Sequence, residues 1–151
     1  MTLVTPLPRA TVRAPTGGTR RLPRVTPSID LMDDTFVVAA RTELATYFRD
    51  PQVWRAWWPA LRLAVAQDRG LEGVRWTVAG ELTGTAEIWL ERWRDGAVVH
   101  WFLRAEPSTS VASPGRLRHR YTREYKARVH ELKDLLEHGR PAGAPRLPAA
   151  R

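Results

Sequence analysis

The sequence predicts an α+β fold: a curved antiparallel sheet of about five to six strands wrapped on a long C-terminal helix, with two short helices after the first strand. Three patterns lead to this prediction. Asp95-Gly96, a two-residue turn signal, joins two extended runs rich in aromatic and β-branched residues. Residues 116–138 repeat apolar side chains at helical spacing. Asp50-Pro51 provides an N-cap and a proline at the first position of a second short helix.

The turn signal also predicts the register of the hairpin. If Asp95-Gly96 forms a type I′ turn, the numbers of facing residues sum to 191. One face then carries the pairs Glu91 with His100, Glu87 with Arg104, and Trp89 with Phe102. The other face carries the pairs Leu90 with Trp101 and Ile88 with Leu103. One face of the sheet is therefore apolar and the other charged, which indicates a concave apolar surface.

The segments before the hairpin follow from the same patterns. The predicted elements are a strand Thr35–Ala40, a helix from Thr42 to Arg49, a helix that starts at Asp50-Pro51 and ends at Pro59, a strand over 61–65 and a strand Val74–Glu81. A three-residue loop over 82–84 would set Val78 opposite Ile88. Arg75 would then face Glu91, and the apolar faces of three strands would merge.

The C-terminal helix is expected from Arg116 to His138, before Gly139 and Pro141. Its apolar side chains fall within a stripe about 120° wide and are Leu117, Tyr121, Tyr125, Val129, Leu132, Leu135 and Leu136. This stripe is expected to cover the apolar face of the sheet. Arg128 falls inside the stripe, and two interpretations stay open: an ion pair with Glu124, or an anchor for an oxygen atom of a bound ligand.

The net charge of +8 lies at the ends of the chain. Residues 1–28 hold five arginines and no acid, and residues 139–151 hold three arginines and no acid. Residues 29–138 are neutral, with 16 basic and 16 acidic side chains. The ends are rich in proline and glycine, so we expect a disordered basic tail over 1–31, one folded domain over 32–138 and a disordered tail over 139–151. No specific nucleic-acid partner is expected, because the folded part carries no excess positive charge.

The 151 residues include no cysteine, which excludes disulfides and thiolate metal sites. No run approaches the ~20 apolar residues of a membrane span, and the N-terminus lacks the apolar stretch of a signal peptide. We therefore expect no transmembrane segment and a cytoplasmic location. No nucleophile elbow, phosphate-binding glycine loop or zinc motif occurs, so no catalytic residue, cofactor or metal is expected. His100 is interpreted as a structural partner of Glu91, with an acid–base His–Glu pair as the alternative.

Three segments in this element order carry a resemblance to a known superfamily: Asp50–Pro59 (DPQVWRAWWP), Gly73–Gly80 (GVRWTVAG) and Gly84–Glu91 (GTAEIWLE). They resemble the START-like, Bet v 1-like or helix-grip superfamily (SRPBCC), and in particular its short bacterial polyketide cyclase/dehydrase and lipid-transport members. The resemblance covers about 33–143. It implies a cavity between the sheet and the C-terminal helix that binds lipids, polyketides, sterols or other hydrophobic molecules. The motifs are structural, so they specify the fold rather than an activity.

The candidate ligand-binding residues line the apolar face of the sheet and the helix stripe: Trp76, Val78, Leu90, Trp101, Leu103, Tyr121, Tyr125, Arg128, Val129 and Leu132. The main hypothesis is binding of a small hydrophobic or amphipathic ligand, such as a lipid or polyketide, with Arg128 as polar anchor. An alternative is a polyketide cyclase, aromatase or dehydratase in which Arg128 and a tyrosine polarise a carbonyl group. A third hypothesis is a structural or interaction protein with a filled core.

Seven tryptophans are present, and six of them matter for these hypotheses. Trp54, Trp57 and Trp58 are interpreted as a hydrophobic plug formed by the second helix. Trp76 and Trp101 point to the concave face, where they are either ordinary core residues or walls of a cavity. Trp89 and Phe102 are placed on the outer face of the sheet, where exposure would favour association, so a homodimer contact is a further hypothesis.

Overall fold

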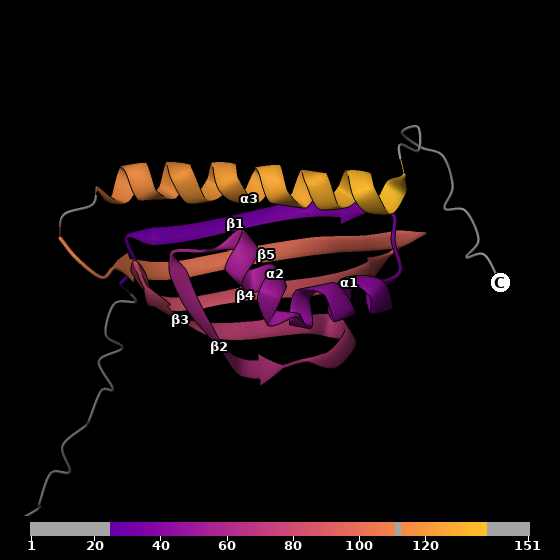
Figure 1. Cartoon of the computed structure of the whole chain (residues 1–151), viewed down its shortest axis with the longest axis horizontal. Coiled ribbons are helices and arrows are strands. Elements are labelled where there is room, and N and C mark those ends of the chain that lie inside the picture. Colours follow the sequence, from indigo (N-terminus) through magenta and orange to yellow (C-terminus); the bar gives the residue numbers. More distant parts are fainter. Residues whose placement is uncertain (1–24, 111–112, 139–151) are drawn as a thin grey trace, which may run out of the picture.

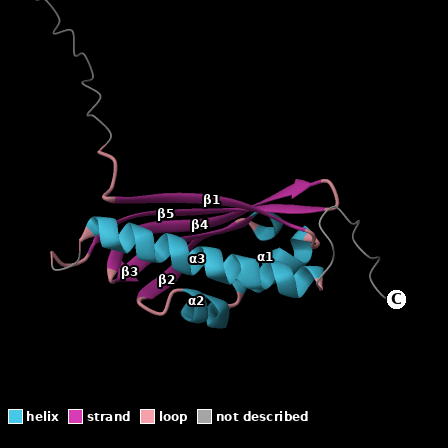
Figure 2. Cartoon of the chain, turned by 90° about the horizontal axis from the view of Figure 1, so that it is seen from above, coloured by secondary structure: helices cyan, strands magenta, loops and turns pink. Residues whose placement is uncertain are grey.

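The computed structural model describes residues 25–110 and 113–138, so residues 1–24 of the tail predicted over 1–31, and the whole tail predicted over 139–151, lie outside the described residues. The elements in chain order are β1 (Ile29–Val37), α1 (Arg41–Arg49), α2 (Pro51–Trp57), β2 (Leu61–Asp68), the 3-10 turn η1 (Gly70–Glu72), β3 (Gly73–Gly80), β4 (Leu82–Trp93), β5 (Gly96–Pro107) and α3 (Pro114–Glu137). Within this part of the chain, five strands form one antiparallel sheet in the order β1-β5-β4-β3-β2. The long helix α3 runs along the sheet, and α1 and α2 lie on the same side (Figures 1 and 2). The predicted helix-grip α+β fold is confirmed.

The strand β1 starts and ends earlier than the predicted strand Thr35–Ala40. It pairs with β5 along its whole length, and the side chain of Ile29 is fully buried. The prediction missed this start because Asp33 interrupts the apolar pattern at an inward-facing position. Lys126 on α3 forms an ion pair with Asp33 and compensates its charge there. The predicted domain start at residue 32 therefore falls inside β1.

The hairpin between β4 and β5 turns earlier than predicted. Trp93 pairs with Gly96, so the turn consists of Arg94 and Asp95, and Arg94 adopts a positive φ of 50°. Gly96 belongs to β5 instead of the turn. A Cβ atom at this position would stand 2.2 Å from the carbonyl oxygen of Val37. The glycine is needed for the close approach of β1 to β5, which its sequence context does not reveal.

The predicted facing pairs of the hairpin are therefore wrong, although every side chain keeps its predicted face. The observed pairs are Glu87 with Phe102, Ile88 with Trp101, Trp89 with His100 and Leu90 with Val99. The register differs from the prediction by two residues, and side chains alternate with a period of two along a strand. The apolar face was therefore predicted correctly from a wrong register.

The register between β3 and β4 is displaced in the same way. Val78 faces Gly84 instead of Ile88, and Arg75 faces Glu87 instead of Glu91. The Arg75 guanidinium donates to a Glu87 carboxylate oxygen from Nη2 at 3.0 Å. This displacement is also an even number of residues, so the apolar faces of the strands still merge.

The helices agree with the sequence patterns except at one position. Asp50 is the N-cap of α2, and its carboxylate accepts a hydrogen bond from the Gln52 backbone N–H at 2.8 Å. The buried side chains of α3 are Leu117, Tyr121, Tyr125, Val129 and Leu132. Leu135 was predicted in this stripe but is 64% exposed, whereas Glu137 in the same turn accepts a hydrogen bond from the Val38 backbone N–H after β1.

Candidate ligand-binding site under the C-terminal helix

Nine of the ten predicted ligand-binding residues lie in the buried core between the sheet and the helices that cover it. They belong to one buried hydrophobic core and are Trp76, Val78, Leu90, Trp101, Leu103, Tyr121, Tyr125, Val129 and Leu132. The strands β3, β4 and β5 contribute the first five, and α3 contributes the other four. The sequence thus predicted that these nine side chains are buried in one core, and contact with a ligand stays a prediction.

Arg128 lies apart from the other nine residues. Its side chain is 46% exposed, and Nη1 lies 3.5 Å from a Glu131 carboxylate oxygen. Nη2 donates to the carbonyl oxygen of Ala56, at the end of α2, at 3.4 Å. The prediction that Arg128 points into the apolar stripe is therefore wrong, because its long side chain carries the charge out to the surface. Because its guanidinium lies at the surface, Arg128 is not placed to anchor a ligand under α3 or to polarise a carbonyl group there together with a tyrosine.

A continuous cluster of aromatic rings occupies the centre of this space. Trp101 and Tyr125 stack with ring centroids 4.1 Å apart and an interplanar angle of 10°. Trp58 lies against both Trp76 and Trp101, with centroid separations of 5.8 Å and 6.4 Å. Trp57 also contacts Tyr125 at 5.9 Å. The predicted plug residues Trp57 and Trp58 are thus part of the same cluster as the predicted ligand contacts.

Three polar atoms in this cluster are buried and have no hydrogen-bond partner among the described residues: Trp76 Nε1, Trp101 Nε1 and Tyr125 Oη. Each such atom costs about 1–3 kcal/mol relative to a hydrogen-bonded one. Burial, together with the nearby carboxylates of Asp33 and Asp34, raises the pKa of Tyr125 well above its usual value. The hydroxyl group is therefore neutral and retains its proton as a donor. Two indole N–H groups and one hydroxyl group can all donate to an acceptor oxygen in this space.

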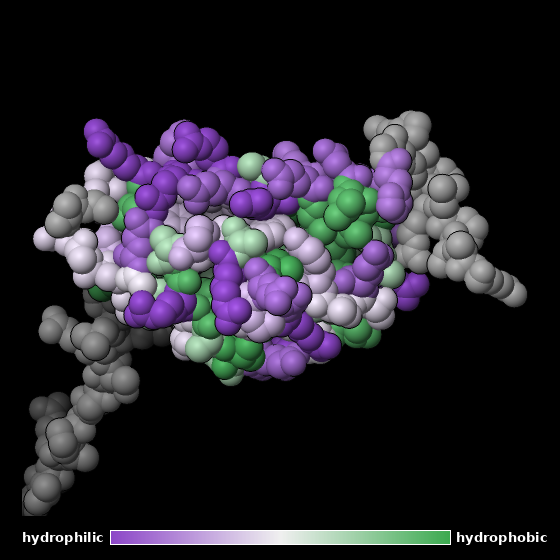
Figure 3. Space-filling view, in the orientation of Figure 1, coloured by the Kyte–Doolittle hydropathy of each residue, from purple (hydrophilic) through white to green (hydrophobic). Residues whose placement is uncertain are grey.

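A surface depression of about 200 Å³ lies beside the aromatic cluster, between α3 and the connection from α2 to β2. Its lining residues are Trp58, Pro59, Ala60, Arg120, Tyr121 and Glu124. Because Trp58 lines the depression and also contacts Trp76 and Trp101, its indole ring separates the depression from the unpartnered atoms. The large apolar patch in Figure 3 lies elsewhere on this face, below the C-terminal half of α3 and near α1.

A polar cluster borders this depression. The Tyr121 hydroxyl donates to a Glu81 carboxylate oxygen at 2.7 Å, and Arg120 forms an ion pair with the same oxygen. Partial burial pushes the pKa of Glu81 upward, but the hydrogen bonds from Arg120 and Tyr121 outweigh it and hold that pKa below its usual value. Burial and the bond to Glu81 raise the pKa of Tyr121. No sequence pattern indicates this cluster, because Glu81 lies 40 residues before Tyr121.

On the opposite face of the sheet, His100 is held between two carboxylates. Its Nδ1 lies 2.6 Å from Asp34 Oδ1, and its Nε2 lies 3.0 Å from Glu91 Oε2. Its ring stacks on Trp89 at a centroid separation of 4.3 Å. The structural contact with Glu91 is confirmed, although it is diagonal across the strands. Both ring nitrogens are engaged, so the geometry gives no support to an acid–base role.

The fold and this space together define a helix-grip domain. No protein-family model and no curated protein matches the sequence. Among solved structures, the chain is similar to the Aha1 dimer from Colwellia psychrerythraea, with a TM-score of 0.55 and 14% identity over 75% of this chain and 99% of that one. It is also similar to DR_A0006 from Deinococcus radiodurans, with a TM-score of 0.54 and 13% identity over 73% and 98% of the two chains. The chain therefore has the START-like, Bet v 1-like helix-grip fold.

No helix in the described part of the chain is both long enough and apolar enough to cross a membrane. Nor do the described residues contain a group of three or more histidine, aspartate and glutamate side chains placed to hold a metal ion.

Proposed function

We propose that the chain binds one small amphipathic molecule between the sheet and α3. The apolar part of the ligand lies against the aromatic cluster, and an acceptor oxygen takes hydrogen bonds from one or more of Trp76 Nε1, Trp101 Nε1 and Tyr125 Oη. The observation that carries the proposal is that these three polar atoms belong to a single connected group of rings and have no hydrogen-bond partner among the described residues. A ligand oxygen would satisfy groups that otherwise destabilise the core.

The ligand class that fits this site is a neutral molecule with an extended apolar body and a carbonyl or hydroxyl oxygen. Polyketides, lipids and their esters meet this description, and the resemblance to helix-grip proteins implies the same class. A carboxylate fits less well, because Asp33 and Asp34 already place negative charge near Tyr125. Each Å² of buried apolar ligand surface contributes about 25 cal/mol, so affinity comes from the rings and orientation from the polar atoms.

Access for the ligand requires the Trp58 ring to move. Trp58 is only 3% exposed, and it lines the 200 Å³ depression on one side while it contacts the two inner tryptophans on the other. Rotation of this one side chain would join the depression to the space under α3. The Glu81–Tyr121–Arg120 cluster would then lie at the mouth of the enlarged site, where it meets the polar end of the ligand.

Native mass spectrometry of protein extracted gently from cells tests the proposal. We expect an adduct of a lipid or polyketide that is lost when the sample is denatured. Val129→Phe adds bulk at the fully buried contact between α3 and the sheet and should abolish the adduct, whereas Leu135→Phe, on the exposed side of the same helix, should retain it. Circular dichroism of both variants is the control for folding. An adduct retained by Val129→Phe contradicts the proposed site. A wild-type protein without any adduct favours a structural or interaction protein with a filled core.

We also propose that the outer face of the sheet forms a homodimer contact. Met32 is 68% exposed and faces the partly buried Phe102, and Trp93 at the end of β4 is 52% exposed. Exposed apolar side chains on one face favour association. Sedimentation of the wild-type chain and of Met32→Glu tests this contact: the variant should shift toward the monomer, and equal sedimentation of the two contradicts the contact.

The proposal also includes the boundaries of the folded domain and its location in the cell. We take residues 29–138 as the folded domain, with the flanking segments as tails, and expect it to act in the cytoplasm. Limited proteolysis that releases a stable fragment spanning these residues supports the boundaries, and cleavage within β1 or α3 contradicts them.

A further inference from the structure

A second depression lies where the ends of β1 and of the β4–β5 hairpin meet the start of α1. Its volume is about 480 Å³, and its lining residues are Ala39, Ala40, Arg41, Thr42, Leu71, Arg92, Arg94, Asp95 and Gly96. The close approach of Gly96 to Val37 fixes the hairpin against β1, so arginines from two separate segments are held beside one another. None of these residues lines the depression beside Trp58.

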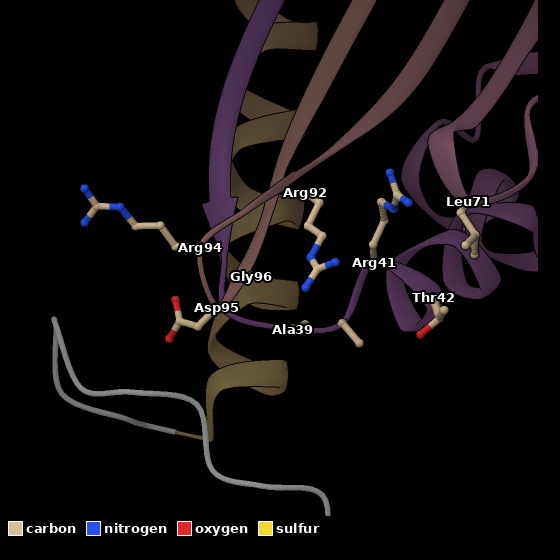
Figure 4. Close-up of a pocket in the computed structure, with 9 residues that line it drawn as sticks. Ala39, Arg41, Thr42, Leu71, Arg92, Arg94, Asp95 and Gly96 are labelled. Carbon is tan, nitrogen blue, oxygen red and sulfur yellow. The ribbon is translucent and has the colours of Figure 1, made fainter.

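The depression carries positive charge that the described residues do not neutralise. Arg92 extends from the end of β4 toward the start of α1, where Arg41 projects from the helix (Figure 4). Neither guanidinium has a hydrogen bond or ion pair with another described residue. Arg94 and Asp95 point away on the other side of the hairpin (Figure 4). Some arginines elsewhere are in ion pairs, as in Arg49–Asp68, Arg75–Glu87 and Arg104–Asp30, whereas others, such as Arg62, have no partner among the described residues but do not line this depression.

We propose that this depression binds a small organic oxyanion, with a phosphate monoester as the best fit. Guanidinium groups donate two parallel hydrogen bonds to phosphate or carboxylate oxygens, and two guanidiniums match the three free oxygens of a phosphate monoester. Thr42, next to Arg41, also lines the depression. The anion lies between Arg41 and Arg92. It supplies the negative charge that no described carboxylate gives these two guanidiniums.

The depression also has room and apolar surface for the organic part of such a ligand. Its volume falls within the roughly 300–1,000 Å³ of small-molecule sites and greatly exceeds that of one phosphate group. Leu71 is 44% exposed and lies beyond Arg41 at one side of the depression (Figure 4), and Ala39 and Ala40 also line it. The ligand is therefore an organic phosphate whose apolar group contacts Leu71, instead of free inorganic phosphate.

This inference is independent of the proposed ligand under α3. The backbone N–H of Val38, next to this depression, bonds to the Glu137 carboxylate in the last turn of α3 at 3.0 Å. The depression beside Trp58 adjoins Arg120 and Glu124, toward the other end of the same helix. The two sites are therefore separate, and an experiment can contradict one binding proposal without contradicting the other.

Titration of the ¹⁵N-labelled full chain with phenyl phosphate tests the proposal. We expect saturable shifts of the backbone signals of Arg41, Thr42 and Gly96, with unchanged indole signals of Trp76 and Trp101. Arg41→Gln and Arg92→Gln should each weaken binding about tenfold, the effect of losing one charged hydrogen-bonding group. Arg62→Gln, on β2, is the matched control and should bind within about twofold of the wild type. Because neither Arg41 nor Arg92 bonds to another described residue, both variants are expected to fold.

Vesicles distinguish a lipid headgroup from a soluble phosphate. Phosphatidylcholine vesicles with and without phosphatidic acid are sedimented with the wild type, Arg92→Gln and Arg62→Gln. Loss of phosphatidic-acid binding in Arg92→Gln alone assigns the oxyanion to a lipid headgroup, and a loss seen only with phenyl phosphate assigns it to a soluble molecule. Either result supports the site. Equal behaviour of Arg92→Gln and Arg62→Gln with both probes overturns it.

Discussion

Gly96 and Val37 lie so close that a Cβ atom at position 96 would stand 2.2 Å from the Val37 carbonyl oxygen. This contact joins the start of β5 to the end of β1, and it holds the hairpin against the strand that leads into α1. We expect Gly96→Ala to lower the free energy of unfolding by about 3 kcal/mol or more, because the obstacle is backbone and cannot rotate away.

Gly115 provides the matched control for this substitution. It lies in the first turn of α3, and an added Cβ would meet no atom closer than 3.7 Å. Gly115→Ala should leave stability unchanged or raise it by up to about 1 kcal/mol, since alanine is the better helix former. Urea unfolding measures both variants. Equal effects of the two alanines would show that Gly96 is not held by β1.

Two tyrosines on α3 are expected to respond to the loss of their hydroxyl groups with opposite signs. Tyr125 Oη is buried without a partner among the described residues, whereas Tyr121 Oη donates to Glu81 at 2.7 Å. Tyr125→Phe should raise the free energy of unfolding of the ligand-free protein by up to about 1 kcal/mol, because it removes an unsatisfied polar atom. Tyr121→Phe should lower it by about 1–2 kcal/mol, because it removes a hydrogen bond to a carboxylate. Thermal unfolding of both variants measures these changes. A loss of stability in Tyr125→Phe would mean that the Tyr125 hydroxyl has a hydrogen-bond partner.

The ion pair of Glu81 predicts a pH dependence. The pKa of Glu81 is lowered in the folded protein from its ordinary value of 4.5, so its contribution to stability is present above that pH and is lost as the pH falls through the lowered value. Glu81→Gln should therefore cost about 1–2 kcal/mol at neutral pH and progressively less in acid. Urea midpoints between pH 7 and pH 3 measure the difference. Glu72→Gln, in the exposed turn η1, is the control, and a Glu81 effect that does not shrink in acid would contradict the ion pair.

The start of the folded domain can be tested by shortening the chain. A chain that begins at Val25 keeps all of β1, whereas one that begins at Met32 loses the fully buried Ile29 and the partly buried Leu31. Loss of a buried isoleucine typically costs about 2–5 kcal/mol, and here the pairing of the strand end with β5 is lost as well. We expect a cooperative thermal transition for the first chain and a much lower or absent one for the second. Equal transitions would restore the boundary expected from sequence.

The side-chain faces could be predicted from the sequence more accurately than the pairing of the strands. Leu90, Trp101 and Val78 were assigned to the apolar face because alternation along a strand is a local property. Register depends on contacts between distant segments, such as the approach of Gly96 to Val37, and no nearby residue signals them. The errors were even numbers of residues, so they changed the partners and preserved the faces.

The same distinction between local patterns and distant contacts applies to the candidate site. The nine apolar and aromatic residues were predicted because helical periodicity and strand alternation determine them. Arg128 was misplaced because a helical wheel locates the Cα atom, and a long side chain carries its charge several ångströms away from it, here to Ala56 and Glu131. The Glu81–Tyr121–Arg120 cluster and the arginines around Arg92 each join segments that are far apart in sequence, so only the structure brings them together.

The most direct test of the binding proposal is the ¹⁵N spectrum of the tryptophan indoles. The wild-type chain is titrated with 2-acetylnaphthalene and with methyl laurate, two neutral molecules that combine an apolar body with a carbonyl oxygen. The proposal predicts saturable shifts of the Trp76 and Trp101 indole signals with at least one probe, and weaker binding in Tyr125→Phe. Indole signals that stay fixed with both probes, while the protein remains folded, would contradict the presence of a ligand site under α3.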